Sequence, residues 1–275
     1  MSTDASVPLV HLNDGVEIPQ IGLGVWRASE DEAAAAVQDA LAAGYRHVDT
    51  AMIYRNERGV GRGVAESGVD RERVFLTSKV WNDDIRAGTT RDALEGTLER
   101  LGVERIDLML LHWPAEGRIA AWEALIEARE AGLVRSIGVS NFTAEHLDEL
   151  VAETSVVPAL NQIEHHPLLT QPAIREACER HGIAVEAWSP LMQGKFGEQS
   201  VLGEIAAAHG RSEAQVVLRW ALQRNVIVIP KSVNRSRIEE NIDILDFVLD
   251  DEAMRRIAAL ERGERLGPDP ATFDF

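Results

Sequence analysis

Cysteine, tyrosine and long apolar runs are scarce in this chain. Cys178 is the only cysteine among 275 residues, so no disulfide can form within the chain. It lies in a run with a helical pattern, where a buried, inert thiol is a more ordinary role than a nucleophile. No stretch approaches the roughly 18 consecutive apolar residues of a membrane span, and residues 1–20 lack the basic flank and apolar run of a secretory signal. We therefore expect a reduced, cytoplasmic protein that has no membrane partner.

Positive charge is also scarce. The chain has 28 lysines and arginines against 45 acidic residues, which gives a net charge of −17 at pH 7. Nucleic-acid binding needs clustered positive charge, so this composition argues against a nucleic-acid partner. Any anionic ligand has to be held by a few local cations, which makes individual lysines and arginines informative.

Short apolar segments alternate with helical patterns along the whole chain. An Asp-Gly turn at residues 14–15, between apolar residues 10–12 and 16–18, predicts an N-terminal β-hairpin. Eight strands are then predicted, at residues 21–25, 47–49, 74–78, 106–111, 134–139, 159–162, 184–187 and 226–229. Helices are predicted at residues 31–43, 57–66, 91–101, 119–131, 173–181, 202–209, 212–223, 235–244 and 250–260, with one more that begins after Thr143. At that last helix His146 stands where a capping box has Glu or Gln, so only half of the capping signal is present.

No Ser/Gly linker, low-complexity tract or change of composition interrupts this alternation, so we expect one domain over residues 1–275. Eight strand–helix units favour a closed parallel barrel. An open doubly wound sheet is the competing architecture, but its glycine-rich phosphate-binding fingerprint is missing. Gly22-Leu23-Gly24 lacks the third glycine and follows a hairpin. The sequence predicts an α/β protein, a (β/α)8 TIM barrel with an N-terminal β-hairpin.

Titratable groups stand at or just beyond the ends of three predicted strands. Asp49 ends one strand and Tyr54 follows five residues later; Lys79 and His112 follow the next two strands. In a parallel barrel this rim is where active sites are built. A lysine near Tyr54 would lower the pKa of the phenol and make it a proton donor usable near neutral pH. The alternatives are a structural Asp49–Lys79 ion pair, a packed core tyrosine and a core histidine.

Two other clusters leave a functional and a structural interpretation open. His165-His166 resembles half of a metal site, but no third ligand stands at a telling spacing, so we interpret the pair as structural and expect no metal. Lys231, Ser232 and Arg237 surround the start of a predicted helix, which suits an anion. A charged helix start on the surface fits that last pattern equally well.

Three segments resemble the signatures of the aldo-keto reductase family. They are residues 44–51 with Glu57, Val60 and Gly61; residues 136–142; and residues 229–232 with Arg237 and Asn241. The segments occur in the family's order over nearly the whole chain. The similarity is strongest to the bacterial 2,5-diketo-D-gluconate reductase-like branch.

The resemblance implies NADPH-dependent reduction of aldehydes and ketones to alcohols by hydride transfer, without a metal. Tyr54 would be the general acid, Lys79 paired with Asp49 would lower its pKa, and His112 would orient the substrate carbonyl. The nicotinamide would stack on Trp188. The other implied cofactor contacts are Ser140, Asn141 and Gln162 at the carboxamide, Ser189, Leu191, Gln193, Gly194 and Lys195 at the pyrophosphate, and Lys231, Ser232, Val233, Arg237 and Asn241 at the adenosine 2′-phosphate and adenine.

Trp26, Trp81 and Trp113 match aromatic positions that line the substrate pocket in the family. The implied substrates are small carbonyls, dicarbonyls or keto-sugars, and the family is often monomeric. The loop at residues 114–119 is short and the tail after Gly267 is brief. Both regions set substrate choice in the family, so the resemblance predicts the chemistry more closely than the substrate.

Two other classes of function compete with the reductase. Lys79 at the end of a barrel strand would also suit a Schiff-base aldolase, since a desolvated lysine can attack a carbonyl. Asp49 beside it would keep the lysine charged and poorly nucleophilic, which argues against that chemistry. A non-enzymatic, cofactor-sensing barrel is the third class, and the complete set of Asp49, Tyr54, Lys79 and His112 argues against it.

Overall fold

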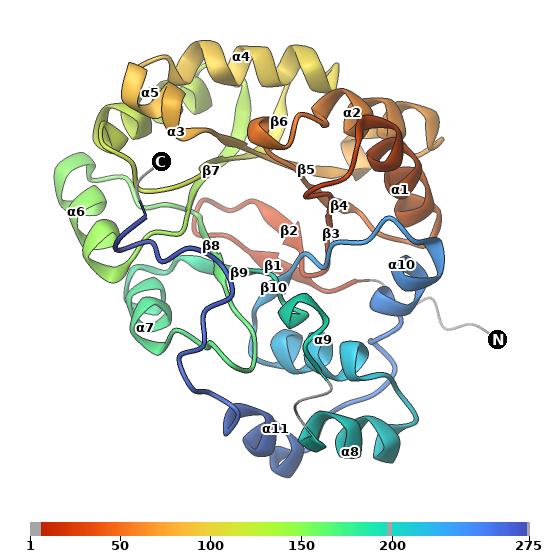
Figure 1. Ribbon diagram of the computed structural model, residues 1–275. Coiled ribbons are helices and arrows are strands. Elements are labelled where there is room, and N and C mark those ends of the chain that lie inside the picture. The colour runs from red at the N-terminus through yellow and green to blue at the C-terminus, as the bar shows by residue number, and fades with distance from the viewer. Residues whose placement is uncertain (1–6, 197–199, 274–275) are drawn as a thin grey trace.

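The computed structural model describes residues 7–196 and 200–273. Eight parallel strands form its central sheet, in the order β10-β9-β8-β7-β6-β5-β4-β3. Isolated parallel bridges pair Ile21 with Val228 and Gly24 with Lys231, and so join the two end strands. We call this junction the closing seam. The predicted (β/α)8 barrel is confirmed, and Figure 1 shows the helices arranged around the strands.

The bounds of the elements follow the predicted alternation. The strands are β1 (Leu9–His11), β2 (Glu17–Pro19), β3 (Leu23–Gly24), β4 (His47–Asp49), β5 (Phe75–Val80), β6 (Ile106–Leu111), β7 (Val134–Ser140), β8 (Leu160–Glu164), β9 (Ala184–Trp188) and β10 (Ile227–Val228). The helices are α1 (Glu30–Ala42), α2 (Glu57–Glu66), α3 (Asn82–Ala87), α4 (Thr90–Leu101), α5 (Arg118–Glu130), α6 (Ala144–Thr154), α7 (Pro172–His181), α8 (Ser200–His209), α9 (Glu213–Gln223), α10 (Arg235–Ile242) and α11 (Asp251–Ala258). Three short 3-10 helices complete the set: η1 (Met52–Tyr54), η2 (Arg71–Arg73) and η3 (Met192–Gly194).

Two details near β5 and α6 differ from the prediction. The strand β5 runs on to Val80, past its predicted end at residue 78, and a further short helix, α3, precedes α4. At α6 the capping box is complete, because His146 replaces the expected carboxylate: the Thr143 N–H donates to His146 Nδ1 at 3.3 Å. Burial lowers the pKa of His146, which keeps the imidazole neutral and Nδ1 available as an acceptor.

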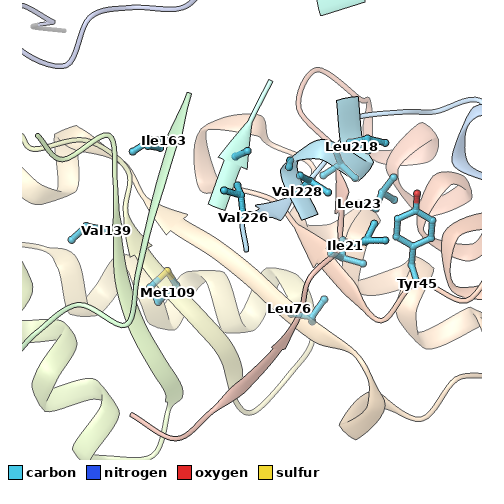
Figure 2. Packing of buried hydrophobic residues seen from close by; sticks show 14 of the residues in the cluster. Ile21, Leu23, Tyr45, Leu76, Met109, Val139, Ile163, Leu218, Val226 and Val228 are labelled. Carbon is cyan, nitrogen blue, oxygen red and sulfur yellow. The ribbon is translucent and has the colours of Figure 1, made fainter. Parts of the chain in front are cut away.

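Alternation along each strand separates the barrel interior from the helix layer. On β6, Met109 and Leu111 pack in the cluster beneath the helices, whereas Leu108 and Leu110 belong to a second cluster inside the barrel. Figure 2 shows part of the first cluster, with Met109 and Val139 on neighbouring strands. The same alternation on β5 turns Ser78 outward to Glu57 of α2, and turns Lys79 inward.

The N-terminal hairpin covers the amino end of the barrel. Its Val10, Leu12 and Ile18 pack in the interior cluster with residues of β6, β8 and β10. The turn is tied down as well, since the Ser136 hydroxyl donates to Asp14 Oδ2 at 2.6 Å. This end is therefore filled by apolar packing, and the Asp49–Lys79 pair lies toward the carboxyl ends of the strands. Figure 1 shows the hairpin, β1 and β2, behind the strands of the barrel.

Cys178 lies fully buried in α7 against Asn161. The predicted burial of this cysteine is confirmed, and burial raises the pKa of its thiol to about 11, which disfavours the reactive thiolate. Within the part of the chain that the structure describes, no helix is long and apolar enough to cross a membrane.

Candidate active site

Asp49 and Lys79 form an ion pair inside the barrel near the carboxyl ends of β4 and β5. The Lys79 ammonium donates to Asp49 Oδ1 at 2.6 Å and to the Thr50 carbonyl at 2.9 Å, and both side chains are buried. Burial works against the charge on Lys79, but the attraction of Asp49, together with that of Tyr54 and Glu186, raises the pKa of the amine. Burial also raises the pKa of Asp49, against the pull of Lys79. The lysine therefore stands in the barrel as a cation.

Tyr54 ends the η1 turn that follows β4. The Lys79 Nζ lies 5.3 Å from the centre of its ring. The expected lowering of its pKa is not found: removal from bulk water raises the pKa of Tyr54, and the attraction of Lys79 only opposes this change. The prediction was wrong because it counted the nearby cation and left out the cost of a buried phenolate. The phenol consequently keeps its proton at neutral pH.

His112 follows β6 directly and completes the set of four. Its ring meets Tyr54 edge to face at a centroid distance of 5.9 Å and Trp81 at 5.1 Å. Burial, helped by the Lys79 charge, holds the pKa of His112 well below its usual value, so the imidazole is neutral. Its Nδ1 is buried and has no hydrogen-bond partner among the described residues, whereas the ring lines a cavity. A neutral imidazole in this place can form a hydrogen bond with a carbonyl group.

A second carboxyl group lies within the barrel, and the sequence analysis missed it. Glu186 points inward from β9, where Gln162 donates to its Oε1 at 2.5 Å and to Asp49 Oδ2 at 2.8 Å. On its other side His47 Nε2 is 3.8 Å from Glu186 Oε2, and burial lowers the pKa of this histidine to about 3. Burial, reinforced by the charge of Asp49, raises the pKa of Glu186 to about 8. Glu186 is therefore neutral at pH 7.

The proton on Glu186 predicts a pH dependence of stability. The folded state binds this proton more tightly than the unfolded chain, whose glutamate has a pKa near 4.5. The contribution is full below pH 4.5 and is lost as the pH rises to about 8. Between pH 6 and pH 8 the contribution of Glu186 should fall by about 2 kcal/mol. Over the same range the buried histidines with lowered pKa values, such as His47 and His112, change stability in the opposite direction, so Glu186→Gln, which resembles the protonated acid, is the reference. In urea denaturation the wild type should lose about 2 kcal/mol relative to this variant as the pH rises; the same change in both proteins would contradict the assignment of this titration to Glu186.

The ends of β7, β8 and β9 bring together the residues that the resemblance assigned to the nicotinamide. The Ser140 hydroxyl donates to the Gln162 carbonyl at 2.8 Å, and the Asn141 amide donates to the His112 carbonyl at 3.0 Å. The indole N–H of Trp188 donates to Asn141 Oδ1 at 2.8 Å. Each of these side chains is held by its neighbours, so the Trp188 ring keeps one orientation at the wall of the cavity.

One cavity of about 690 Å³ joins these groups. Three tryptophans line its mouth, as predicted, although Trp26 is 44% exposed. The expected site residues in its wall are Asp49, Tyr54, His112, Ser140, Asn141, Gln162, Trp188, Ser189, Leu191, Gln193, Lys231, Trp26, Trp81 and Trp113. Lys79 lies behind this wall, and the remaining expected residues, Gly194, Lys195, Ser232, Val233, Arg237 and Asn241, are not part of the wall.

The basic segment after β10 leads from this cavity to the start of α10. Asn234 caps the helix by accepting the Arg237 N–H at 3.2 Å. Arg235 is paired with Glu239 at 2.9 Å, whereas Lys231 and Arg237 form no ion pair with any described residue. Two unpaired cations at a helix start suit an anion, particularly in a chain of net charge −17. The residues present therefore fit a ligand that carries a phosphate group at this end of the cavity.

Comparisons with known proteins agree with this geometry. The Aldo/keto reductase family model matches residues 20–262. The chain belongs to this family. A glyoxal reductase of Bacillus subtilis (strain 168) is 50% identical over 268 residues, which cover 97% of each chain. Methylglyoxal reductase DkgA of Escherichia coli (strain K12) is 46% identical over 274 residues, which cover 98% of this chain and 99% of that protein. The predicted family, and with it an oxidoreductase, is confirmed.

A solved structure of a Gox0644 variant in complex with NADPH has a TM-score of 0.93 to this fold and is 44% identical in sequence. The alignment covers 98% of this chain and 100% of that one. The similarity extends over the whole barrel, and the bound molecule in that protein is the cofactor that the three sequence signatures imply.

In this aldo/keto reductase the tail after α11 also reaches the site. Buried Glu164 accepts the Leu266 N–H at 2.7 Å and the Gly267 N–H at 3.2 Å, which holds the tail beside Trp188. A Cβ atom at residue 267 would lie 2.4 Å from the indole, so only glycine fits there. The sequence analysis noted that this tail is brief but missed its anchor, because a single Glu in a strand does not reveal its partner a hundred residues away.

The pair His165-His166 has structural contacts in this aldo/keto reductase. His166 Nε2 lies 2.9 Å from Glu164 Oε1, and His165 stacks on Trp220 with a centroid distance of 5.4 Å. Both rings are fully buried. These contacts give each histidine a packing role, in line with the structural interpretation drawn from the sequence.

Proposed function

We propose that this protein reduces aldehyde and ketone groups to alcohols with NADPH, and that small dicarbonyls are its first candidate substrates. The observation that carries the proposal is the placement of Tyr54 and His112 in one cavity, with the Lys79 ammonium directly behind them. The names of the glyoxal and methylglyoxal reductases support the choice of substrate class. A panel of glyoxal, methylglyoxal and keto-sugars, followed by the absorbance of NADPH, tests it.

Tyr54 would act as the general acid. Its raised pKa keeps the phenol protonated until the carbonyl oxygen gains charge. NADPH supplies the hydride that the carbonyl carbon receives. Tyr54 would then transfer its proton to the carbonyl oxygen, and the Lys79 ammonium would stabilise the phenolate that remains. Neutral His112 would orient the substrate oxygen by a hydrogen bond from its ring.

The cofactor would span the cavity from Trp188 to the start of α10. Ser140, Asn141 and Gln162 would meet its carboxamide, and the loop with Ser189, Leu191, Gln193, Gly194 and Lys195 would cover its pyrophosphate. Lys231, Ser232, Val233 and Arg237 would hold the 2′-phosphate, and Asn241 the adenine. Support comes from the two unpaired cations, Lys231 and Arg237. NADH has no 2′-phosphate, so it would leave both cations without a bound anion.

Replacing Arg237 with alanine should therefore weaken NADPH binding about 10- to 100-fold and leave NADH binding nearly unchanged, since a charge-assisted contact to phosphate is lost. Quenching of tryptophan fluorescence by each cofactor gives the two dissociation constants. Arg235→Ala is the matched control, because Arg235 lies on the same turn but is paired with Glu239. Equal losses for NADPH and NADH would argue against a phosphate contact at Arg237.

A Schiff-base aldolase is less consistent with the site. A lysine nucleophile has to be neutral, and Asp49 at 2.6 Å keeps Lys79 charged. Covalent trapping of a carbonyl substrate on Lys79 by borohydride would reverse this preference.

We further propose that residues 1–275 act as a single barrel domain and that the protein is a cytoplasmic monomer. Sedimentation of the purified protein would test the oligomeric state.

A further inference from the structure

The side-chain amide of Gln162 lies between two carboxyl groups. Its Nε2 is 2.8 Å from Asp49 Oδ2 and 2.5 Å from Glu186 Oε1, and all three side chains are buried. A carbonyl oxygen in this position would face carboxyl oxygens on both sides. A proton on Glu186 would satisfy such an oxygen on one side only and would leave the repulsion from Asp49. The group between the two acids must therefore be the NH2, which uses both of its hydrogens there.

The other end of the amide is consequently fixed as well. With its NH2 held inside the barrel, Gln162 turns its Oε1 toward the cavity that it lines with Asn141 and Trp188. This oxygen accepts no hydrogen bond from the residues in 7–196 and 200–273. The main chain of Gln162 is held too, since its carbonyl accepts from the Ser140 hydroxyl and from the Asn141 N–H. Gln162 thus offers the cavity a rigid group that can only accept a hydrogen bond.

We propose that Glu186 is a positioning residue that locks the Gln162 amide in this orientation, so that the cavity selects a ligand with an N–H donor at this point. The inference rests on the proposed function, in which the donor is the carboxamide NH2 of the nicotinamide. An apolar residue at position 186 would leave one amide hydrogen without an acceptor in a dry interior, and would free the amide to rotate. Because Glu186 is uncharged at neutral pH, it supplies this acceptor without adding a second negative charge beside Asp49.

The test compares two cofactors that differ in this one donor. In 3-acetylpyridine adenine dinucleotide phosphate a methyl ketone replaces the carboxamide of NADP+, so the 2′-phosphate is kept and the N–H is lost. Dissociation constants come from quenching of tryptophan fluorescence, with no substrate present. The wild type should bind NADP+ about tenfold more tightly than the analogue, as one lost hydrogen bond predicts. Glu186→Met should bring the two constants within about twofold by weakening NADP+, and Glu186→Gln, which keeps an acceptor, should restore the difference.

The possible results distinguish a failure of this inference from a failure of the proposed function. If the wild type binds neither cofactor, the proposed function fails. If it binds both and Glu186→Met keeps the tenfold preference, the role of Glu186 is overturned. Circular dichroism establishes that the variants are folded. Should Glu186→Met not fold, Gln162→Met removes the acceptor itself, and a Gln162→Met protein that still prefers NADP+ to the analogue overturns the proposal.

Discussion

Replacing Tyr54 with phenylalanine should lower kcat for carbonyl reduction by about 10²- to 10⁴-fold, because the variant has no proton to give to the carbonyl oxygen. The ring and its contacts with His112 and Lys79 remain, so the cavity should keep its shape. The dissociation constant for NADPH should stay within about twofold, since the phenol is not among the proposed cofactor contacts. Steady-state rates with methylglyoxal, together with fluorescence titration of NADPH, measure both effects.

The chain supplies a matched control for this variant, because Tyr45 is its only other tyrosine. The Tyr45 hydroxyl donates to the Ile238 carbonyl at 3.1 Å, in the core beneath α10 and away from the cavity. Tyr45→Phe removes the same atom and should cost about 1 kcal/mol of stability with little change in kcat. A Tyr54→Phe protein that retained full activity would exclude Tyr54 as the general acid.

Lys79→Met should reduce both stability and turnover. The substitution leaves Asp49 buried without its counter-ion, which typically costs about 3–5 kcal/mol of the free energy of unfolding. It also removes the cation that would stabilise the Tyr54 phenolate, so we expect kcat to fall at least 10²-fold. Urea denaturation at pH 7 gives the first quantity, and rates measured under conditions where the variant is folded give the second.

Two controls separate the stability effect from the catalytic one. Asp49→Asn combined with Lys79→Met removes the unpaired charge, so it should recover much of the stability and none of the turnover. Arg91 and Glu95 form an ion pair of the same 2.6 Å length on the exposed side of α4. Arg91→Met should lose far less stability, because solvent screens that pair. If Lys79→Met lost no more than Arg91→Met, the pair in the barrel would not carry the energetic role given to it here.

The architecture could be predicted from the sequence because its signals are local. Parallel strands are covered on both faces, so they appear as short apolar runs such as residues 108–111, and each is followed by a helical pattern. The errors fell where longer-range contacts decide the outcome. At the closing seam β3 and β10 have only two residues each, although longer strands were predicted. The His146 cap was underestimated because burial, which keeps its ring neutral, cannot be seen in the pattern.

The sequence could predict a site residue only where that residue lies at or just beyond the end of a strand. Asp49, Tyr54 and His112 line the cavity because each lies at or beyond the carboxyl end of its strand. Glu186 gave no such signal: it lies within β9, and its partner Gln162 is on another strand. The direction of the Tyr54 pKa shift was also beyond the sequence, because it depends on how much water the finished cavity excludes. The distance between side chains on different strands, the register of those strands and the exclusion of water from the cavity are all properties of the assembled barrel.

The closing seam has a consequence for the synthesis of this protein. Gly22 and Val228 share a backbone hydrogen bond of 2.8 Å, yet about 200 residues of chain separate them. A chain growing on the ribosome therefore completes β3 long before the strand that pairs with its free edge exists. Until β10 emerges, the curved sheet has two unpaired edges whose N–H and C=O groups can bind a second nascent chain. The pairing of β10 with β9 on one side and with the segment at Gly22 on the other removes both of these edges at once.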